Sequence, residues 1–167
     1  MKEKLQIRLW QEGDSVSELT ELLHRAYKQL ADMGLRFLAT HQDDSITLDR
    51  ITRGKCYLGL IDDTVISTVT LYPIHETHGT PWYDKEDVAH FGQFGVEPRL
   101  QKQGIGDIMM DYVEQVAKEE SIRELALDTS EKAEHLIRYY TRRGYRFVEH
   151  TQWPEVNYRS VIMTKTL

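Results

Sequence analysis

The stretch from His90 to Ser121 constrains the fold of this chain more than any other. An extended run over 90–96 leads into Pro98, which has no backbone N–H and therefore cannot continue a paired strand. Beyond the loop that follows, apolar residues recur at helical spacing, at Ile105, Ile108, Met109, Tyr112, Val113 and Val116. The stretch therefore predicts a strand, a glycine-bearing loop and a helix in direct succession.

The start of this helix is a predicted anion site. The first backbone N–H groups of a helix have no partner within it, and the helix dipole adds partial positive charge at the same end. Gly104 and Gly106 remove side chains that would keep an anion away, so a phosphate-sized group fits. The alternative is a plain tight turn. The absence of a Gly-Lys-Ser/Thr sequence argues against a P-loop.

Three motifs resemble the GNAT superfamily of acyl-CoA-dependent N-acetyltransferases. Residues 101–106, with the pattern Gln-x-x-Gly-x-Gly, are similar to the Gln/Arg-x-x-Gly-x-Gly/Ala loop of that family. Residues 96–98 resemble its strand-ending Val-x-Pro, and residues 140–145 resemble its Tyr-x-x-x-Gly-Phe element. The resemblance is specific over about residues 88 to 150. It implies an N-acetyltransferase that uses acetyl-CoA as co-substrate and needs no metal.

Residues 1–167 are expected to form one domain, because the chain is long enough to bury a single core and shows no repeat or linker. The resemblance implies a mixed α/β fold, in which a central sheet of about seven strands is flanked by about four helices. It also implies that the fourth and fifth strands splay apart. Hydrophobic patterning places the strands near 7–10, 57–61, 65–71, 90–96, 125–129, 145–149 and 160–164. It places the helices near 16–34, 45–53, 107–121 and 133–143.

Composition excludes several classes of partner. The net charge is −6 without a basic tract, which argues against nucleic acid, and no apolar run approaches the roughly 20 residues of a membrane span. The start, Met1 to Lys4, has no apolar segment behind it and Cys56 is the only cysteine, so the cytoplasm is the expected compartment. The expected partner is a small-molecule or peptide amine. The habit of the family and an exposed last strand allow a homodimer.

Similarity to the family assigns the coenzyme's phosphates to the glycine loop. The cofactor-binding residues there are Gln101, Lys102, Gln103, Gly104, Ile105, Gly106 and Asp107, acting mainly through backbone N–H groups. Arg99 and Lys102 are either cations for the phosphates or ordinary solvated charges. Asp107 departs from expectation, since it puts a carboxylate beside the anion, although an acidic residue also favours a helix start.

The family likewise assigns two groups to the preceding strand. The backbone N–H of Phe94 would stabilise the charge that gathers on the thioester oxygen, and Val96 would pair with the pantetheine arm. Both need the fourth and fifth strands to separate. Gly92 and Gly95 either ease a bulge at this place or relieve crowding under a helix.

His90 and Tyr140 are the two candidate catalytic side chains. By strand alternation His90 is expected to share a face with Phe94 and Val96, and its ordinary pKa of ~6.5 suits a base. The alternatives are a water-mediated role and a purely structural one. Tyr140 aligns with the tyrosine that protonates the departing thiolate in many relatives, although core packing would also explain it. The family often has Asn seven residues earlier, where this chain has Ala133.

Other features offer weaker hypotheses. His75-x-x-His78 lacks a third metal ligand, and Cys56 is expected to be a small core residue. Trp82 with Asp84, Glu86 and Asp87 forms either a rim that binds a cationic amine or a solvated acidic loop. Two competing functions are a non-catalytic acyl-CoA-binding module and a nucleotide-binding domain. Retention of both His90 and Tyr140 favours the enzyme.

Overall fold

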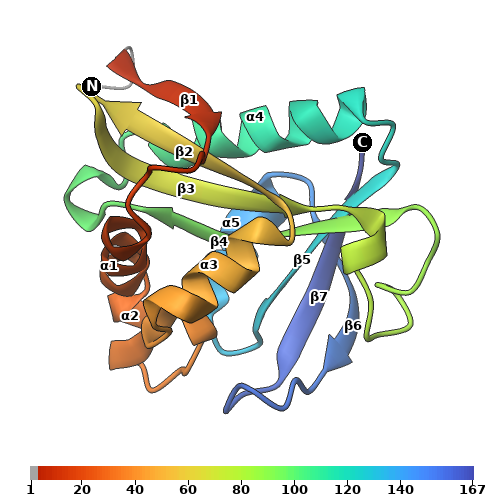
Figure 1. The fold of residues 1–167 in the computed structure, drawn as a ribbon. Helices are drawn as coiled ribbons and strands as arrows, with labels where there is room; N and C mark the ends of the chain where they lie inside the picture. Colours follow the sequence, from red (N-terminus) through yellow and green to blue (C-terminus); the bar gives the residue numbers. More distant parts are fainter. Residues whose placement is uncertain (1–3) are drawn as a thin grey trace.

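A computed structural model describes residues 4–167. Residues 1–3 belong to the start of the chain, where no leader was expected, and they lie outside this range. The strands are β1 (Gln6–Leu9), β2 (Lys55–Ile61), β3 (Thr64–Tyr72), β4 (Val88–Val96), β5 (Glu124–Ser130), β6 (Arg146–Thr151) and β7 (Ser160–Thr166). The helices are α1 (Val16–Ala26), α2 (Lys28–Asp32), α3 (Asp44–Thr52), α4 (Ile105–Glu119) and α5 (Glu134–Arg142). The mixed α/β class is confirmed (Figure 1).

The described residues contain one helix more than expected. The helix predicted to run to about Gly34 is divided at Tyr27, whose ψ of 2° leaves the helical region. The Tyr27 ring packs against Phe37 with ring centres 5.7 Å apart. This aromatic contact lies beyond the range of helical periodicity, so the sequence pattern could not reveal it.

The seven strands form one sheet in the order β1-β2-β3-β4-β5-β7-β6. Only β4 and β5 are parallel, as predicted from the helix between them, and the other neighbours are antiparallel. The expectation of an exposed last strand is wrong. The hairpin of β6 and β7 folds back so that β7 lies between β5 and β6, and β6 is the edge. The homodimer therefore loses the argument that rested on β7.

Two helical layers cover the sheet, with α4 and α5 on one face and α1 and α3 on the other (Figure 1). Strand β2 shows why, because its apolar residues alternate between the faces. Tyr57 and Ile61 join the cluster around α4, whereas Leu58 and Leu60 pack with α1. Both faces of the central strands are thus buried.

Strands β4 and β5 pair only at their beginnings. Residues 88–90 of β4 pair with 124–126 of β5, after which β5 continues along β7 to Ser130 without β4. The predicted splay is therefore present. It opens the sheet at the carboxyl ends of its two parallel strands, where α/β folds commonly place ligand sites.

Candidate active site

A cavity of about 1020 Å³ fills the opening between β4 and β5. Both diverging strands line it, together with parts of α1, α3, α5 and the start of α4. The lining includes the candidate residues His90, Phe94, Val96, Gln101, Lys102, Gly104, Gly106, Asp107 and Tyr140. Gln103 and Ile105 complete the same loop without lining the cavity.

A bulge at Gln93 divides the functional groups of β4 between the two faces of the sheet. Gln93 has a φ of +48°, and the pairing with β3 shifts at this point. Phe94 and Val96 therefore lie on the α4 face, whereas His90 lies on the opposite face. The expectation that His90 shares a face with these two residues is wrong, because the extra residue reverses the alternation.

The same part of β4 turns backbone N–H groups toward the cavity. The N–H of Glu97 donates to the carbonyl of Ile66 on β3, at 2.7 Å. Successive N–H groups of a strand point to opposite sides, so those of Val96 and Phe94 point away from β3, into the space that β5 has left. The Val96 carbonyl on that side accepts the side-chain amide of Gln101 at 3.1 Å.

Gly95 serves close packing. A Cβ built on Gly95 would lie 2.9 Å from the Cβ of Ala26 on α1, a distance that side chains do not tolerate. At Gly92 the nearest atom would be a ring carbon of Tyr72 at 3.5 Å, an ordinary contact. The predicted bulge thus exists, but its positive φ falls on Gln93, and Gly95 relieves crowding under α1.

The loop before α4 has the backbone of an anion cradle. Gly104 precedes the helix with φ of +86°, and Lys102 has φ of +62°. The first-turn N–H groups, from Ile105 to Asp107, have no partner within α4. Ile105 is buried in the core and anchors this turn, while Gly106 brings it against Phe94.

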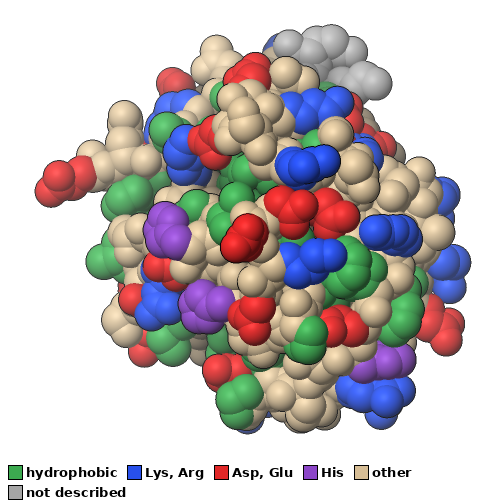
Figure 2. All heavy atoms as spheres, turned by 90° about the vertical axis from the view of Figure 1, so that its right-hand side faces the viewer, with side chains coloured by type: hydrophobic (Ala, Val, Ile, Leu, Met, Phe, Trp, Pro, Cys, Tyr) green, Lys and Arg blue, Asp and Glu red, His purple; other side chains and the backbone are tan. Residues whose placement is uncertain are grey.

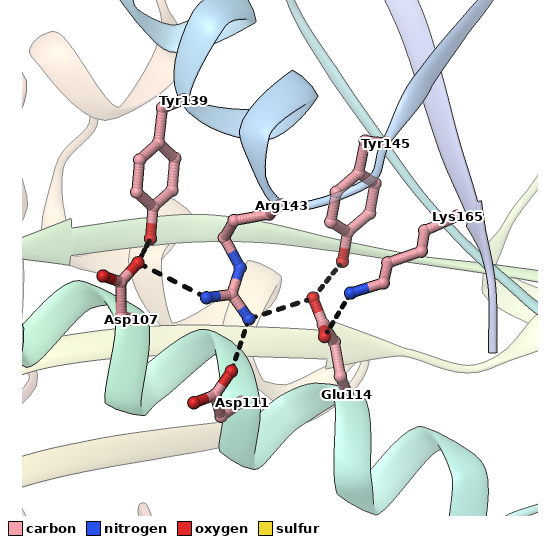
Figure 3. A network of polar contacts seen from close by, with 7 residues as sticks. All are labelled: Asp107, Asp111, Glu114, Tyr139, Arg143, Tyr145 and Lys165. Carbon is pink, nitrogen blue, oxygen red and sulfur yellow. Dashed lines mark hydrogen bonds and ion pairs between the residues drawn. The ribbon is translucent and has the colours of Figure 1, made fainter.

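The Asp107 carboxylate is turned away from the loop toward α5. It accepts the Tyr139 hydroxyl at 2.7 Å and a guanidinium N–H of Arg143 at 3.3 Å (Figure 3). Arg143 also pairs with Asp111, and Glu114 holds Tyr145 and Lys165 in the same network. Asp107 is therefore partly neutralised, which lessens its conflict with an anion at the start of α4.

Tyr140 lies on the cavity wall with 7% of its surface exposed. Its ring packs edge to face against Phe91, with ring centres 5.9 Å apart, and its hydroxyl makes no hydrogen bond within residues 4–167. Burial raises the pKa of this phenol well above its usual value, so the group stays protonated. Ala133, in place of the family's Asn, precedes α5 without a side-chain cap and is fully buried with Leu30 and Phe37.

His90 is stacked between Tyr72 and Tyr83, with ring centres 4.6 and 5.0 Å away. Its Nδ1 lies 2.7 Å from the hydroxyl of Thr77, which gives its own proton to the Pro73 carbonyl. Thr77 can therefore only accept from His90, so we assign the proton to Nδ1 and a free lone pair to Nε2. Burial, with the charges of Arg50 and His78, lowers the pKa of His90 to about 3. This pKa lies well below the ordinary ~6.5 that would suit a direct base.

With this geometry established, comparison with known proteins decides the family. A model of the acetyltransferase (GNAT) family matches residues 16–145. The chain belongs to this family. It is an acyl-CoA-dependent acetyltransferase, as its motifs predicted. The S-(2-succino)cysteine N-acetyltransferase of Bacillus subtilis (strain 168) is 32% identical to it over 147 residues, which are 85% of this chain and 84% of that protein.

Solved structures share the fold of this acetyltransferase at low sequence identity. A GNAT family acetyltransferase from Elizabethkingia anophelis with acetyl-CoA bound is 18% identical, with a TM-score of 0.70 over 98% of this chain and 99% of that one. PaiA N-acetyltransferase from Thermoplasma acidophilum in complex with coenzyme A is also 18% identical, with a TM-score of 0.74 and the same coverage of both chains. These likenesses establish the fold.

Two charged residues of this GNAT protein, Arg50 on α3 and Asp128 on β5, line the cavity and were missed in the sequence. Asp128 had a signal, because it ends an apolar parallel strand, where α/β proteins place ligand-binding groups. Arg50 had none, since its neighbours in the sequence are those of an ordinary surface helix. Its place depends on the docking of α3 against α1.

The loop of Trp82 to Asp87 does not reach the cavity of the acetyltransferase. Trp82 donates to Glu124 and is already covered by Lys85, whose Nζ lies 3.9 Å from its ring. Figure 2 shows the face that carries the β3–β4 connection, where acidic and basic side chains alternate without a patch of one sign. The carboxylates that do line the cavity are Asp49, Glu76, Asp107, Asp128 and Glu155.

The remaining hypotheses concern metals and the thiol. Within residues 4–167, no group of three or more His, Cys, Asp or Glu side chains is arranged to hold a metal ion. His78 lines the cavity, whereas His75 does not. Cys56 is a buried free thiol, as predicted. None of the described helices is both long and apolar enough to cross a membrane.

Proposed function

We propose that this protein is an N-acetyltransferase that moves an acetyl group from acetyl-CoA to a primary amine, by direct attack of the amine on the thioester. The observation that carries the proposal is the divergence of β4 from β5. It directs the N–H groups of Phe94 and Val96 into a cavity that also holds Tyr140 and the start of α4. A strand edge, an anion cradle and a buried phenol thus meet in one space.

The residues present fit a coenzyme with phosphates and an extended amide-bearing arm. The first turn of α4 offers unpaired N–H groups behind the left-handed Gly104, and Lys102 lies in the exposed loop beside it. Val96 can pair through its N–H with an extended amide chain, as in the addition of a strand. Relatives of the same fold that bind acetyl-CoA or coenzyme A support this assignment.

The proposed acetyl transfer needs two hydrogen-bond donors on the α4 side of the cavity. The Phe94 N–H would donate to the thioester oxygen as the new N–C bond forms, stabilising its developing charge. As the C–S bond breaks, the Tyr140 hydroxyl would give its proton to the departing sulfur. Tyr140 is available for that transfer, because its phenol remains protonated and has no other hydrogen-bond acceptor among the described residues.

His90 remains our candidate for the proton that the amine must lose, in a restricted role. Its free Nε2 lone pair can accept a hydrogen bond from the amine. A pKa of about 3 does not let the ring keep that proton at neutral pH, so the proton must pass on to water. His90 would thus orient and relay, with water as the final acceptor.

The test is thiol release from acetyl-CoA in the presence of a panel of amines, with mass spectrometry of the products. The panel should contain polyamines, amino sugars, peptide N-termini, amino acids and S-(2-succino)cysteine, the compound in the name of the B. subtilis relative. We expect at least one amine to gain an acetyl group in step with thiol release. If acetyl-CoA binds and no amine is acetylated, a non-catalytic role would replace this proposal.

Two wider proposals accompany it. We propose that residues 1–167 act as one domain, because one sheet runs through the described chain from β1 to β6. We also retain the cytoplasm as the expected compartment, which the buried free thiol of Cys56 supports.

A further inference from the structure

Arg50 presents a positive charge to the cavity without an acidic partner. Its guanidinium donates at 2.8 Å to the side-chain oxygen of Gln42 and forms no ion pair within residues 4–167. Gln42 is fully buried and donates in turn to Thr47 at 2.9 Å and to Gln93 at 2.8 Å. Neutral, buried amides therefore hold Arg50 in place and leave its charge available to a ligand.

Asp128 presents the opposite charge in a similar way. One of its oxygens accepts the hydroxyl of the buried Tyr83 at 2.7 Å, and no cation pairs with it among the described residues. Burial raises the pKa of Asp128, while the Tyr83 hydroxyl and the charge of Arg50 hold it down. A carboxylate in such surroundings is destabilised until a cation reaches it.

The two charges face one space without neutralising each other. Arg50 and Asp128 are both partly buried on the cavity wall, and neither has a partner of opposite charge within residues 4–167, so the pair points to a ligand that completes both. We propose that Arg50 and Asp128 form a subsite for an amine acceptor that also carries a carboxylate, with Arg50 binding the carboxylate and Asp128 the ammonium group. This inference rests on the proposed function and names the class of its acceptor as amino acids.

Ligands that carry charges of only one sign fit this pair of side chains less well. A diamine would bring its second cation against Arg50, and a simple carboxylic acid would bring its charge against Asp128. An amino acid carries one charge for each of the two side chains, and the guanidinium fork matches the geometry of a carboxylate. The subsite lies on the His90 side of β4, away from the start of α4 where the phosphates are proposed to bind.

The test uses two probes, S-methylcysteine and its carboxamide, whose α-carboxyl group is charged in the first and neutral in the second. Binding is measured at about pH 6, so that the α-amino groups of both probes stay protonated. Their dissociation constants are measured calorimetrically on the full chain saturated with coenzyme A, so that no turnover is needed. We expect the parent to bind S-methylcysteine at least tenfold more tightly than the carboxamide. Arg50→Gln should remove this preference, and Asp128→Asn should weaken both probes by a similar factor.

Arg53→Gln is the matched control, because Arg53 caps the end of the same helix, lines the same cavity and is already paired with Asp49 at 3.0 Å. It should keep the preference, and thermal melting of each variant checks the fold. Equal binding of both probes by the parent, or a preference that survives Arg50→Gln, would overturn the subsite. An equal loss in Arg53→Gln would also overturn it, by showing a general effect of positive charge. Because binding is read without acetyl transfer, these outcomes are separate from failure of the proposed reaction.

Discussion

The two walls of the cavity are built in different ways. On the α4 side, the groups proposed to meet the coenzyme are mostly backbone N–H groups, supplied by the continuous segment from Phe94 to Asp107. On the other side, side chains from positions as distant as Arg50, His90 and Asp128 converge. A wall made of backbone groups in one segment leaves a local signature in the sequence, and a wall of converging side chains does not.

The walls also differ in electrostatic state. The start of α4 uses dipoles and the partly neutralised Asp107, which cost little in the absence of a ligand. The opposite wall holds a neutral His90 with its pKa lowered to about 3, and an Asp128 with its pKa raised by burial. Groups perturbed in this way cluster at functional sites. We therefore expect the first wall to govern coenzyme affinity and the second to govern the choice of acceptor.

The largest effect should come from Tyr140, where the walls meet. Tyr140→Phe removes the hydroxyl that we propose protonates the departing sulfur and keeps the ring that packs on Phe91. We expect kcat to fall by about 10²- to 10⁴-fold, as is typical when general acid catalysis is lost. Acetyl-CoA affinity, measured by calorimetry, should stay within about twofold, since binding on this wall depends on backbone groups.

Tyr139→Phe is the control for Tyr140, because the neighbouring hydroxyl is already bound to Asp107. Its kcat should remain within about threefold of the parent, as expected for loss of a partly exposed hydrogen bond. Full turnover in Tyr140→Phe would remove the acid from the mechanism and leave the sulfur to be protonated by water.

The second-largest effect should come from a substitution in the loop before α4, where we propose that the phosphates bind. In the parent, acetyl-CoA at ~100 times its dissociation constant should raise the free energy of unfolding by about 2.7 kcal/mol. Gly104→Val places a branched side chain at φ of +86° before α4 and should abolish this gain. Thermal shift with and without ligand measures the gain.

Gly13→Val controls for strain, since Gly13 has φ of +103° with no atom within 4 Å of a built Cβ. Both variants should lose stability without ligand, by ~1–3 kcal/mol for a strained backbone. Only Gly13→Val should keep the ligand-induced gain. A normal gain in Gly104→Val would take the phosphates away from this loop.

The contrast between the two walls of the cavity also decides which parts of the structure could be predicted from the sequence. Local patterns predicted the strand, loop and helix from 90 to 121 and the parallel pairing of β4 with β5, and the structure confirms both. The bulge was expected near the glycines, yet the positive φ fell on Gln93, because Gly95 is needed for contact with α1. That choice depends on packing between residues far apart in the chain, which periodicity does not record.

The pH dependence of stability, which involves His90, is a third test of the difference between the two walls. Because the folded pKa of His90 is about 3 and the unfolded value ~6.5, the folded state binds fewer protons between these values. Stability that is present above pH 6.5 is therefore lost as the pH falls toward 3. Urea unfolding should show that His90→Gln flattens this dependence by up to ~1.4 kcal/mol per pH unit, less if cavity water screens the half-buried ring.

The same variant reports on the rate. If the acidic limb of kcat/KM has its midpoint near 6.5, it cannot come from His90, and it should follow the basicity of the amine in both parent and variant. A limb near 6.5 that disappears in His90→Gln would show that coenzyme or substrate binding restores an ordinary imidazole, and would return His90 to the role of a direct base.

The smallest effect tests where the acceptor wall ends, meaning the cavity wall opposite α4 that we expect to govern the choice of acceptor. Glu155 lines the cavity, whereas Glu86 belongs to the β3–β4 loop that does not reach it. Both are exposed, so each charge is worth only ~0.2–1 kcal/mol to a cation and is screened over ~8–10 Å by ordinary salt. For an amine of net positive charge, we expect Glu155→Gln to raise KM by roughly two- to threefold at low salt, an effect that fades as salt rises. Glu86→Gln should leave KM unchanged. If both variants raise KM equally, the acceptor responds to the overall negative charge of the protein, and the acceptor wall would not be the sole source of its selectivity.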